Sequence, residues 1–210
     1  MIAGGGQRFV QANTQMRRER RHRQLFSILA TLLLAWSAVA ATATWADGGV
    51  FVVEQAGTRL EEGVYRLDAR ISYQFSEAVR EALQNGVPLT VEIQIEVYRG
   101  RWYWLNEDVA ELSQFYLLQF HALSRQYLLT SLNSGAQRSF SSLYSALEVM
   151  GRMQDVPILD KKLLKPDTRY QARLRVRLDI ESLPSPLRPV AYLSDEWRLV
   201  SEWYEWSLNS

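Results

Sequence analysis

Cysteine is absent from the 210-residue chain, which excludes disulfide bonds, thiolate nucleophiles, zinc–sulfur centres and a lipid-modified cysteine anchor. Only two histidines are present, and one of them, His22, lies near the N-terminus. The other, His121, lies in an apolar stretch, and we expect a packed or hydrogen-bonded structural residue rather than a general base. No acidic segment has the spacing of a calcium loop, so neither a metal site nor a cofactor is expected.

Motifs of covalent and acid–base catalysis are also missing. No serine lies in a G-x-S-x-G or S-x-x-K arrangement, so the sequence predicts no catalytic residues and a protein that is not an enzyme. Asp68, Glu92, Glu96 and Asp179 could form a glycosidase-like acid pair. Arginines share their faces, however, and we favour cross-strand ion pairs on a solvated sheet face.

Net charge is close to zero, at +1, but it is unevenly distributed. Residues 1–46 hold six arginines and one acid, a charge of +5, whereas residues 47–210 hold 18 basic and 22 acidic side chains, a charge of −4. A nucleic-acid-binding domain needs positive potential on one face. The composition therefore excludes nucleic acid as a partner of the folded part.

Long apolar runs are confined to the N-terminal region. The basic stretch 16–23 precedes residues 25–46, which carry no charge and end in small residues, with possible cleavage after Ala43 or Ala46. This order predicts a secretory signal peptide over 16–46, and the alternative is an uncleaved anchor that contacts the inner membrane through residues 25–46. In both cases the domain is periplasmic. Residues 1–15 would be a non-native or disordered extension, with Met16 as the true start.

Strict alternation of apolar and polar residues runs through Tyr170–Ile180, and the same pattern recurs at Tyr65–Phe75 and Leu89–Tyr98. This period of two indicates strands with one buried face, which need a second layer. Residues 47–210 are therefore predicted to form a single all-β domain. We expect an immunoglobulin-like antiparallel β-sandwich of about seven or eight strands behind an N-terminal hydrophobic signal helix.

Other segments complete this prediction. Ser76 should cap a short helix that runs to Gln84, and Ser141 should cap a second helix at Leu143–Met150. The stretch Leu112–His121 is apolar on both faces, which suggests a central strand. Leu183–Pro189 should be an extended, stiff crossover, and Trp197–Leu208 the last strand, with a bulge near Val200.

Tryptophan is the unusual feature of the domain, because all five tryptophans after residue 46 fall in two clusters. The candidate ligand or partner surface consists of Trp102, Tyr103, Trp104, Trp203, Tyr204 and Trp206. Exposed tryptophan favours binding of a sugar, a peptide, a partner or the membrane interface, whereas the plainer interpretation is packing in the core and at sheet edges.

Several segments, taken together and in order, are similar to a known family. They are Asn85–Leu89, Trp102–Trp104, Tyr116–Leu128, Arg138–Phe140, Leu178–Pro184, Pro186–Pro189 and Trp203–Trp206. Over residues 50–208 the chain resembles a proteobacterial family of exported proteins catalogued as domain of unknown function 4390. The resemblance implies a single domain behind a signal sequence, and it supplies no activity and no catalytic residues. Genes of this family often lie beside one for an NtrY-type membrane sensor kinase, which implies a role in envelope signalling.

Two functions follow as expectations. The first is a non-catalytic interaction module of the cell envelope that acts through an envelope protein partner, with the sensor kinase as the first candidate. The second is a periplasmic glycan- or peptide-binding module that uses the tryptophan clusters.

Overall fold

The computed structural model describes residues 48–100 and 107–208. This part of the chain is mostly β, with nine strands and three short α-helices. The strands are β1 (Val50–Glu61), β2 (Val64–Gln74), β3 (Leu89–Arg99), β4 (Glu107–His121), β5 (Gln126–Ser131), β6 (Gln137–Phe140), β7 (Arg152–Asp160), β8 (Tyr170–Leu178) and β9 (Tyr204–Leu208). The helices are α2 (Glu77–Gln84), α3 (Leu143–Met150) and α4 (Arg188–Leu193), with 3₁₀ turns η1 (Lys161–Leu163), η2 (Ile180–Ser182) and η3 (Asp195–Trp197).

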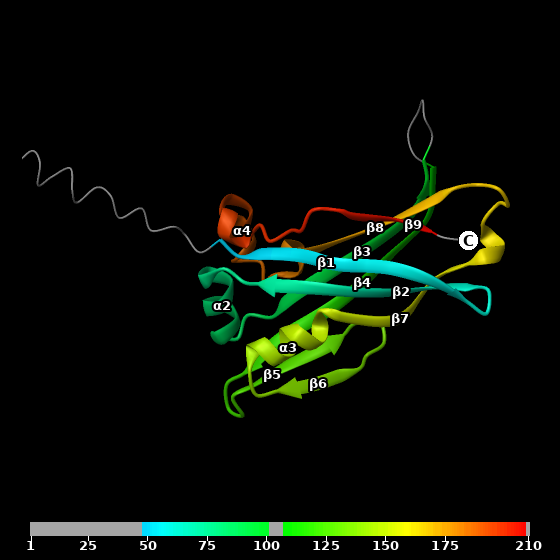
Figure 1. Cartoon of the computed structure of the whole chain (residues 1–210). Helices are drawn as coiled ribbons and strands as arrows, with labels where there is room; N and C mark the ends of the chain where they lie inside the picture. Colours follow the sequence, from blue (N-terminus) through cyan, green and yellow to red (C-terminus); the bar gives the residue numbers. More distant parts are fainter. Residues whose placement is uncertain (1–47, 101–106, 209–210) are drawn as a thin grey trace, which may run out of the picture. The chain divides into compact units, whose positions relative to one another are not determined.

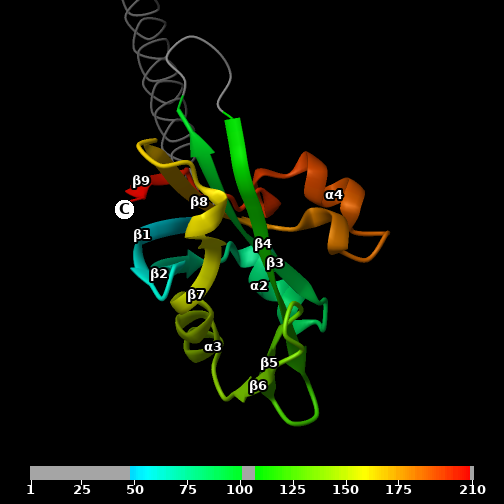
Figure 2. The same ribbon diagram turned by 90° about the vertical axis from the view of Figure 1, so that its right-hand side faces the viewer.

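The strands form two antiparallel sheets, as the sequence predicts. One sheet has the order β1-β2-β7 and the other the order β6-β5-β4-β3-β8-β9. Figures 1 and 2 show the three-stranded sheet on one side of β3 and β4. The strand order also places β4 between β5 and β3, which confirms the central strand expected from its two apolar faces.

The core lies between the sheets and follows the alternation in the sequence. In β8 the side chains of Tyr170, Ala172, Leu174, Val176 and Leu178 are all buried. Their partners across the strand pair are buried residues of β3, such as Ile93 opposite Val176. The period-two pattern therefore identified the inward faces correctly, because a buried sheet face needs an apolar residue at every second position.

Both predicted helices are present. The side chain of Ser76 accepts a hydrogen bond from the backbone N–H of Val79 and caps α2, as expected. The cap of α3 is Ser142 and not Ser141 as predicted, because it is the Ser142 side chain that accepts a hydrogen bond from the N–H of Ser145. Each helix carries few buried residues. In α3 these pack against strands of both sheets, β2 and β7 of the smaller and β5 and β6 of the larger.

Three details differ from the prediction. The described strands number nine rather than seven or eight, because short β6 and β9 pair as full members of the larger sheet. The crossover expected at Leu183–Pro189 is extended only in part, since α4 begins at Arg188 with Pro189 in its first turn, where no N–H is needed. The last strand is also shorter, since η3 occupies Asp195–Trp197 and the ladder resumes only at Tyr204.

Some expectations concern residues outside the described ranges. These are the extension 1–15, the signal segment 16–46 and the cluster Trp102, Tyr103 and Trp104. No helix among residues 48–100 and 107–208 is long and apolar enough to span a membrane.

Candidate functional site

A ladder of arginines covers the outward face of the larger sheet. Arg173, Arg175 and Arg177 alternate along β8, and register pairs them with Glu96, Gln94 and Glu92 of β3. The three Nε atoms donate to these partners, over 2.7 Å to Glu96, 2.6 Å to Gln94 and 2.6 Å to Glu92. The predicted cross-strand ion pairs are therefore confirmed at two of the three rungs.

Glu92 is the most enclosed member of this ladder. Its side chain is 6% exposed, and its second carboxylate oxygen accepts a hydrogen bond from Ser113 Oγ at 2.8 Å. Glu92 and Glu96 are four residues apart on one strand, so their Cα atoms lie roughly 13 Å apart. In glycosidases the two carboxyl groups lie roughly 5 to 9.5 Å apart. Here each carboxylate binds an arginine of β8, so the arrangement fits ion pairs better than a shared acid pair.

Trp203 joins the arginine ladder because the β8–β9 pairing is interrupted. Ser201 Oγ accepts a hydrogen bond from the N–H of Val176, and Ser201 N donates to the carbonyl of Val176. The guanidinium carbons of Arg173 and Arg175 each lie 4.4 Å from the centroid of a ring of the half-buried Trp203. The guanidinium of Arg173 also lies 5.2 Å from the ring of Tyr98. The result is an arginine–aromatic cluster on the outward face.

The neighbouring aromatic residues lie on the other side of the strand. Tyr204 pairs with buried Leu174, and Trp206 pairs with buried Ala172. Trp206 Nε1 donates to Thr58 Oγ1 of β1 at 3.2 Å and so links the two sheets. Of the predicted surface residues that are described, Trp203 therefore faces outward, and Tyr204 and Trp206 face the interior.

A groove of about 490 Å³ adjoins the arginine ladder. Glu92, Arg175 and Arg177 line it together with the apolar side chains of Phe115 and Leu199. Tyr192 of α4 and Val200 also line it. Three arginines and three carboxylates line the groove in all, so it combines aromatic and aliphatic surface with charged groups of both signs.

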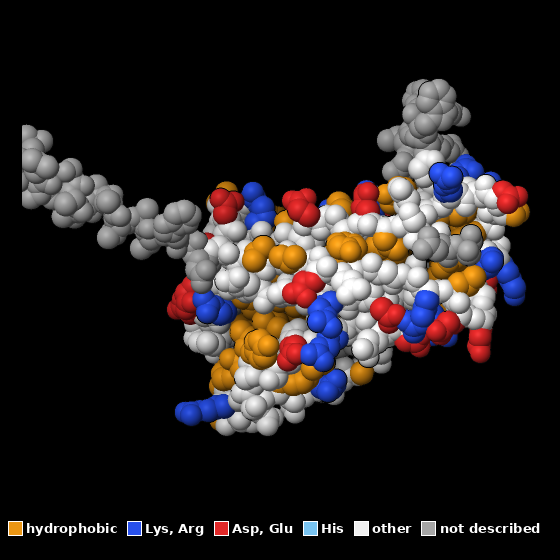
Figure 3. Space-filling view, in the orientation of Figure 1, with side chains coloured by type: hydrophobic (Ala, Val, Ile, Leu, Met, Phe, Trp, Pro, Cys, Tyr) orange, Lys and Arg blue, Asp and Glu red, His pale blue; other side chains and the backbone are white. Residues whose placement is uncertain are grey.

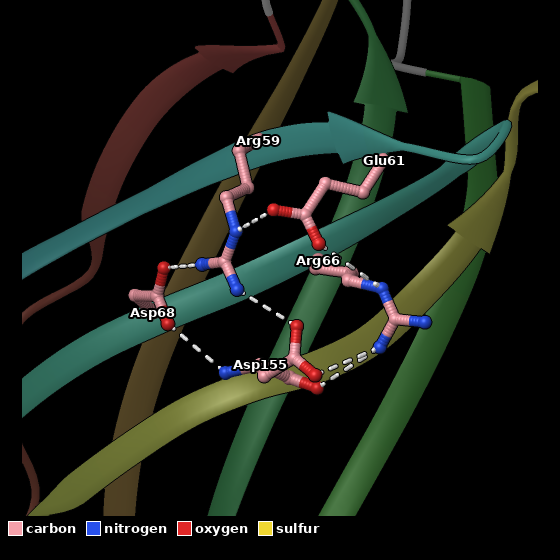
Figure 4. Close-up of polar contacts among 5 residues, drawn as sticks. All are labelled: Arg59, Glu61, Arg66, Asp68 and Asp155. Atoms are coloured by element: carbon pink, nitrogen blue, oxygen red, sulfur yellow. Dashed lines mark hydrogen bonds and ion pairs between the residues drawn. The ribbon is translucent and has the colours of Figure 1, made fainter.

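A second polar cluster lies on the outward face of the three-stranded sheet (Figure 4). Arg59 contacts Glu61 at 2.6 Å, Asp155 at 2.7 Å and also Asp68. Arg66 Nη1 lies 3.0 Å from Asp155, and the N–H of Asp155 donates to Asp68 at 2.9 Å. Basic and acidic side chains are interspersed over this face in Figure 3. Since these partners satisfy each other, we interpret the cluster as a surface ion network that joins β1, β2 and β7.

His121 lies at the end of β4 and is exposed rather than packed. Its Nδ1 lies 3.0 Å from Ser124 Oγ, so the hydrogen-bonded alternative is confirmed and the packed one is wrong. The physical reason is that β4 ends there and the chain turns at residues 122–125. Among the described residues, no group of His, Asp and Glu side chains could hold a metal ion.

Three tyrosines have perturbed acidity. Burial raises the pKa of Tyr98, and the nearby carboxylate of Glu205 adds to this rise, whereas Arg173 opposes it. Burial likewise raises the pKa of Tyr116. Burial raises the pKa of Tyr73 far above its usual value of 10.0, and its hydroxyl has no hydrogen-bond partner among the described residues.

Comparison with known proteins gives one match. The family model described as Domain of unknown function (DUF4390) matches residues 49–207. No curated protein and no solved structure matches the chain.

Proposed function

Because the chain belongs to the family described as Domain of unknown function (DUF4390), whose description states no activity, we propose its function from the described surface. The protein is a non-catalytic interaction module of the cell envelope, and it binds a protein partner through the outward face of its larger sheet. We define this binding face by Arg173, Arg175, Arg177 and Trp203 together with the adjoining groove.

The observation that carries the proposal is the placement of Trp203 against Arg173 and Arg175. Tryptophan, tyrosine and arginine are the residue types that contribute most binding energy at protein interfaces. Here they are held in fixed positions by the strand register and by hydrogen bonds to β3, so little side-chain entropy is lost on binding. The groove beside them offers apolar and charged surface to a partner side chain.

The strand order supports the immunoglobulin-like topology that the sequence predicts. If β1, β2 and β7 are strands A, B and E, then β9, β8, β3, β4 and β5 take the positions G, F, C, C′ and C″ of a variable-type domain. The departure is β6, which pairs with β5 instead of joining the smaller sheet. Since a fold hosts many functions, this topology supports the architecture alone.

The N-terminal sequence supports an envelope location for the partner. A basic stretch followed by the uncharged residues 25–46 supports export into the periplasm, with or without retention of the anchor. We propose an envelope protein as the partner, and the sensor kinase suggested by the family resemblance is the first candidate.

The glycan- or peptide-binding alternative has weaker support. A sugar platform needs an open aromatic ring face, but two guanidinium groups already lie over the rings of Trp203. Trp206 faces the interior and is hydrogen bonded to Thr58. A ligand would have to displace an arginine from its partner before it could stack on Trp203.

Site-specific photo-cross-linking in cells tests the proposal. A photoreactive amino acid at Val200, which lines the groove, should cross-link to one dominant envelope protein. Val52 is the matched control, because it is a valine of similar exposure, 44% against 46%, on the other sheet. Equal cross-linking from both positions, or none from Val200, would contradict a binding face on the larger sheet.

A further inference from the structure

An exposed apolar segment projects from one end of the domain. Between Glu181 and Asp195 the only charged residue is Arg188. Three prolines in this stretch are exposed, and so are three large side chains of α4. These residues are Pro184, Pro186, Pro189, Val190, Tyr192 and Leu193. Among them Leu193 is 89% exposed, and it lies with its neighbours in one contiguous run on a short helix that packs through one buried alanine.

This segment lies at the end where the chain enters the domain. Gly49 packs so closely on the backbone of Ser76 and on Leu199 that an added Cβ would lie 2.3 Å from Ser76 N and 2.8 Å from Leu199 Cδ2. Ser76 Oγ in turn donates to the carbonyl of Glu196 in η3, and η3 packs beside α4. Figure 1 shows α4 at the same end of the domain as the start of β1, opposite the C-terminus, and Figure 2 shows that α4 and β1 are set apart in depth.

The sequence just before this entry point is itself apolar. Residues 25–46 carry no charge, and Ala46 is two residues before Gly48, the first described residue. Two residues span at most about 7 Å. In the uncleaved chain, a bilayer entered by residues 25–46 would therefore lie within reach of this end of the domain.

We propose that the segment 184–193 rests on the lipid bilayer, with Leu193 in the interfacial region. This inference rests on the proposed export and on retention of the N-terminal segment. The composition fits an interfacial position, because proline and aliphatic side chains enter the acyl boundary, while tyrosine and arginine remain at the headgroups. The proposed occupant is lipid rather than a second protein, because this surface shares its end of the domain with the entry point.

With the segment 184–193 on the bilayer, the binding face would also lie near the membrane surface. Tyr192 belongs to α4 and at the same time lines the groove beside Arg175 and Arg177. A partner in the groove would then lie close to the bilayer surface, as the extracytoplasmic part of a membrane protein does.

The natural absence of cysteine makes a direct test possible. Leu193→Cys in the full chain, labelled with a polarity-sensitive fluorophore and reconstituted into vesicles of phosphatidylethanolamine and phosphatidylglycerol, reports the environment of α4. Leu123→Cys and Leu163→Cys are matched controls, since these leucines are also exposed, at 95% and 68%, in the β4–β5 turn and in η1. All three positions are on the surface, so the labelled variants should fold.

The expected result is that the probe at position 193 alone shifts to the blue and is quenched by spin-labelled lipid. A probe at 193 that behaves like the one at 163 would overturn the proposal, and so would equal quenching at all three positions. The assay contains no protein partner. Its failure would therefore leave the proposed binding face untouched, and failure of the cross-linking test would leave the bilayer contact untouched.

Discussion

Tyr73→Phe is predicted to stabilise the protein. The Tyr73 hydroxyl is buried and has no hydrogen-bond partner among the described residues, so it loses its contacts with water on folding without replacement. A buried polar group left unsatisfied costs about 1–3 kcal/mol. The ring would keep its edge-on contact with Phe51, whose centroid lies 5.1 Å away, because phenylalanine has the same ring. We therefore expect a gain of about 1 kcal/mol in the free energy of unfolding at neutral pH.

The gain should grow at alkaline pH. Burial raises the pKa of Tyr73 above its usual value of 10.0, so above pH 10 the unfolded chain loses a proton that the folded chain keeps. The folded state then binds more protons than the unfolded state, and stability falls by up to about 1.4 kcal/mol per pH unit for this residue. Phenylalanine has no proton to lose. The variant should therefore lose less stability than the wild type between pH 10 and 11.

Urea unfolding followed by tryptophan fluorescence at pH 7, 10 and 11 measures both effects. The control is Tyr170→Phe, because the hydroxyl of buried Tyr170 accepts a hydrogen bond from the N–H of Lys165 at 3.1 Å. That variant should be destabilised by about 1 kcal/mol at pH 7. A loss of stability in Tyr73→Phe similar to that of the control would refute the reasoning, since it would mean that the Tyr73 hydroxyl has a partner.

Two further predictions concern local packing and charge. Arg177→Ala removes the ion-pair partner of the 6%-exposed Glu92, so we expect a loss of about 2 kcal/mol at pH 7, measured by chemical denaturation. The loss should disappear when Glu92 is also replaced by Gln, and an unchanged loss in that double variant would contradict this cause. Gly151→Ala should cost roughly 1–3 kcal/mol, because the added Cβ would lie 2.1 Å from the Ile71 carbonyl oxygen. Gly57→Ala is its control, as nothing lies within 4 Å of that Cβ, and equal melting temperatures of the two variants would argue against the predicted clash.

The sequence was sufficient to predict the inward faces of the strands. In β8, every second residue from Tyr170 to Leu178 is buried as the alternation indicates, because the pleat fixes where each side chain points. Two helix positions were also predictable, since a serine cap and a following turn residue are local signals. The helix α4 was missed because its three-proline surroundings favour extended chain, and its burial depends on a single alanine.

The candidate binding face was only partly predictable. The alternation places Arg173 and Arg175 on one outward face, and the slipped pattern near Val200 indicates that aromatics of the last strand point both ways. The contact of Trp203 with those arginines depends on the interruption of the ladder at Ser201, where a side chain replaces a backbone partner. Such a long-range register cannot be read from one segment alone, because it is fixed by the pairing of two strands.

The binding face is tested most directly by the affinity of the Arg175→Glu variant for the envelope partner, measured by titration calorimetry. Arg175 lies over Trp203 and lines the groove, so reversal of its charge should weaken binding by a factor of about 30 or more, as expected for an interface hot spot. Arg70→Glu is the control, because Arg70 is exposed on the three-stranded sheet, and it should leave the affinity unchanged. Equal affinities of the two variants would contradict a binding face on the larger sheet.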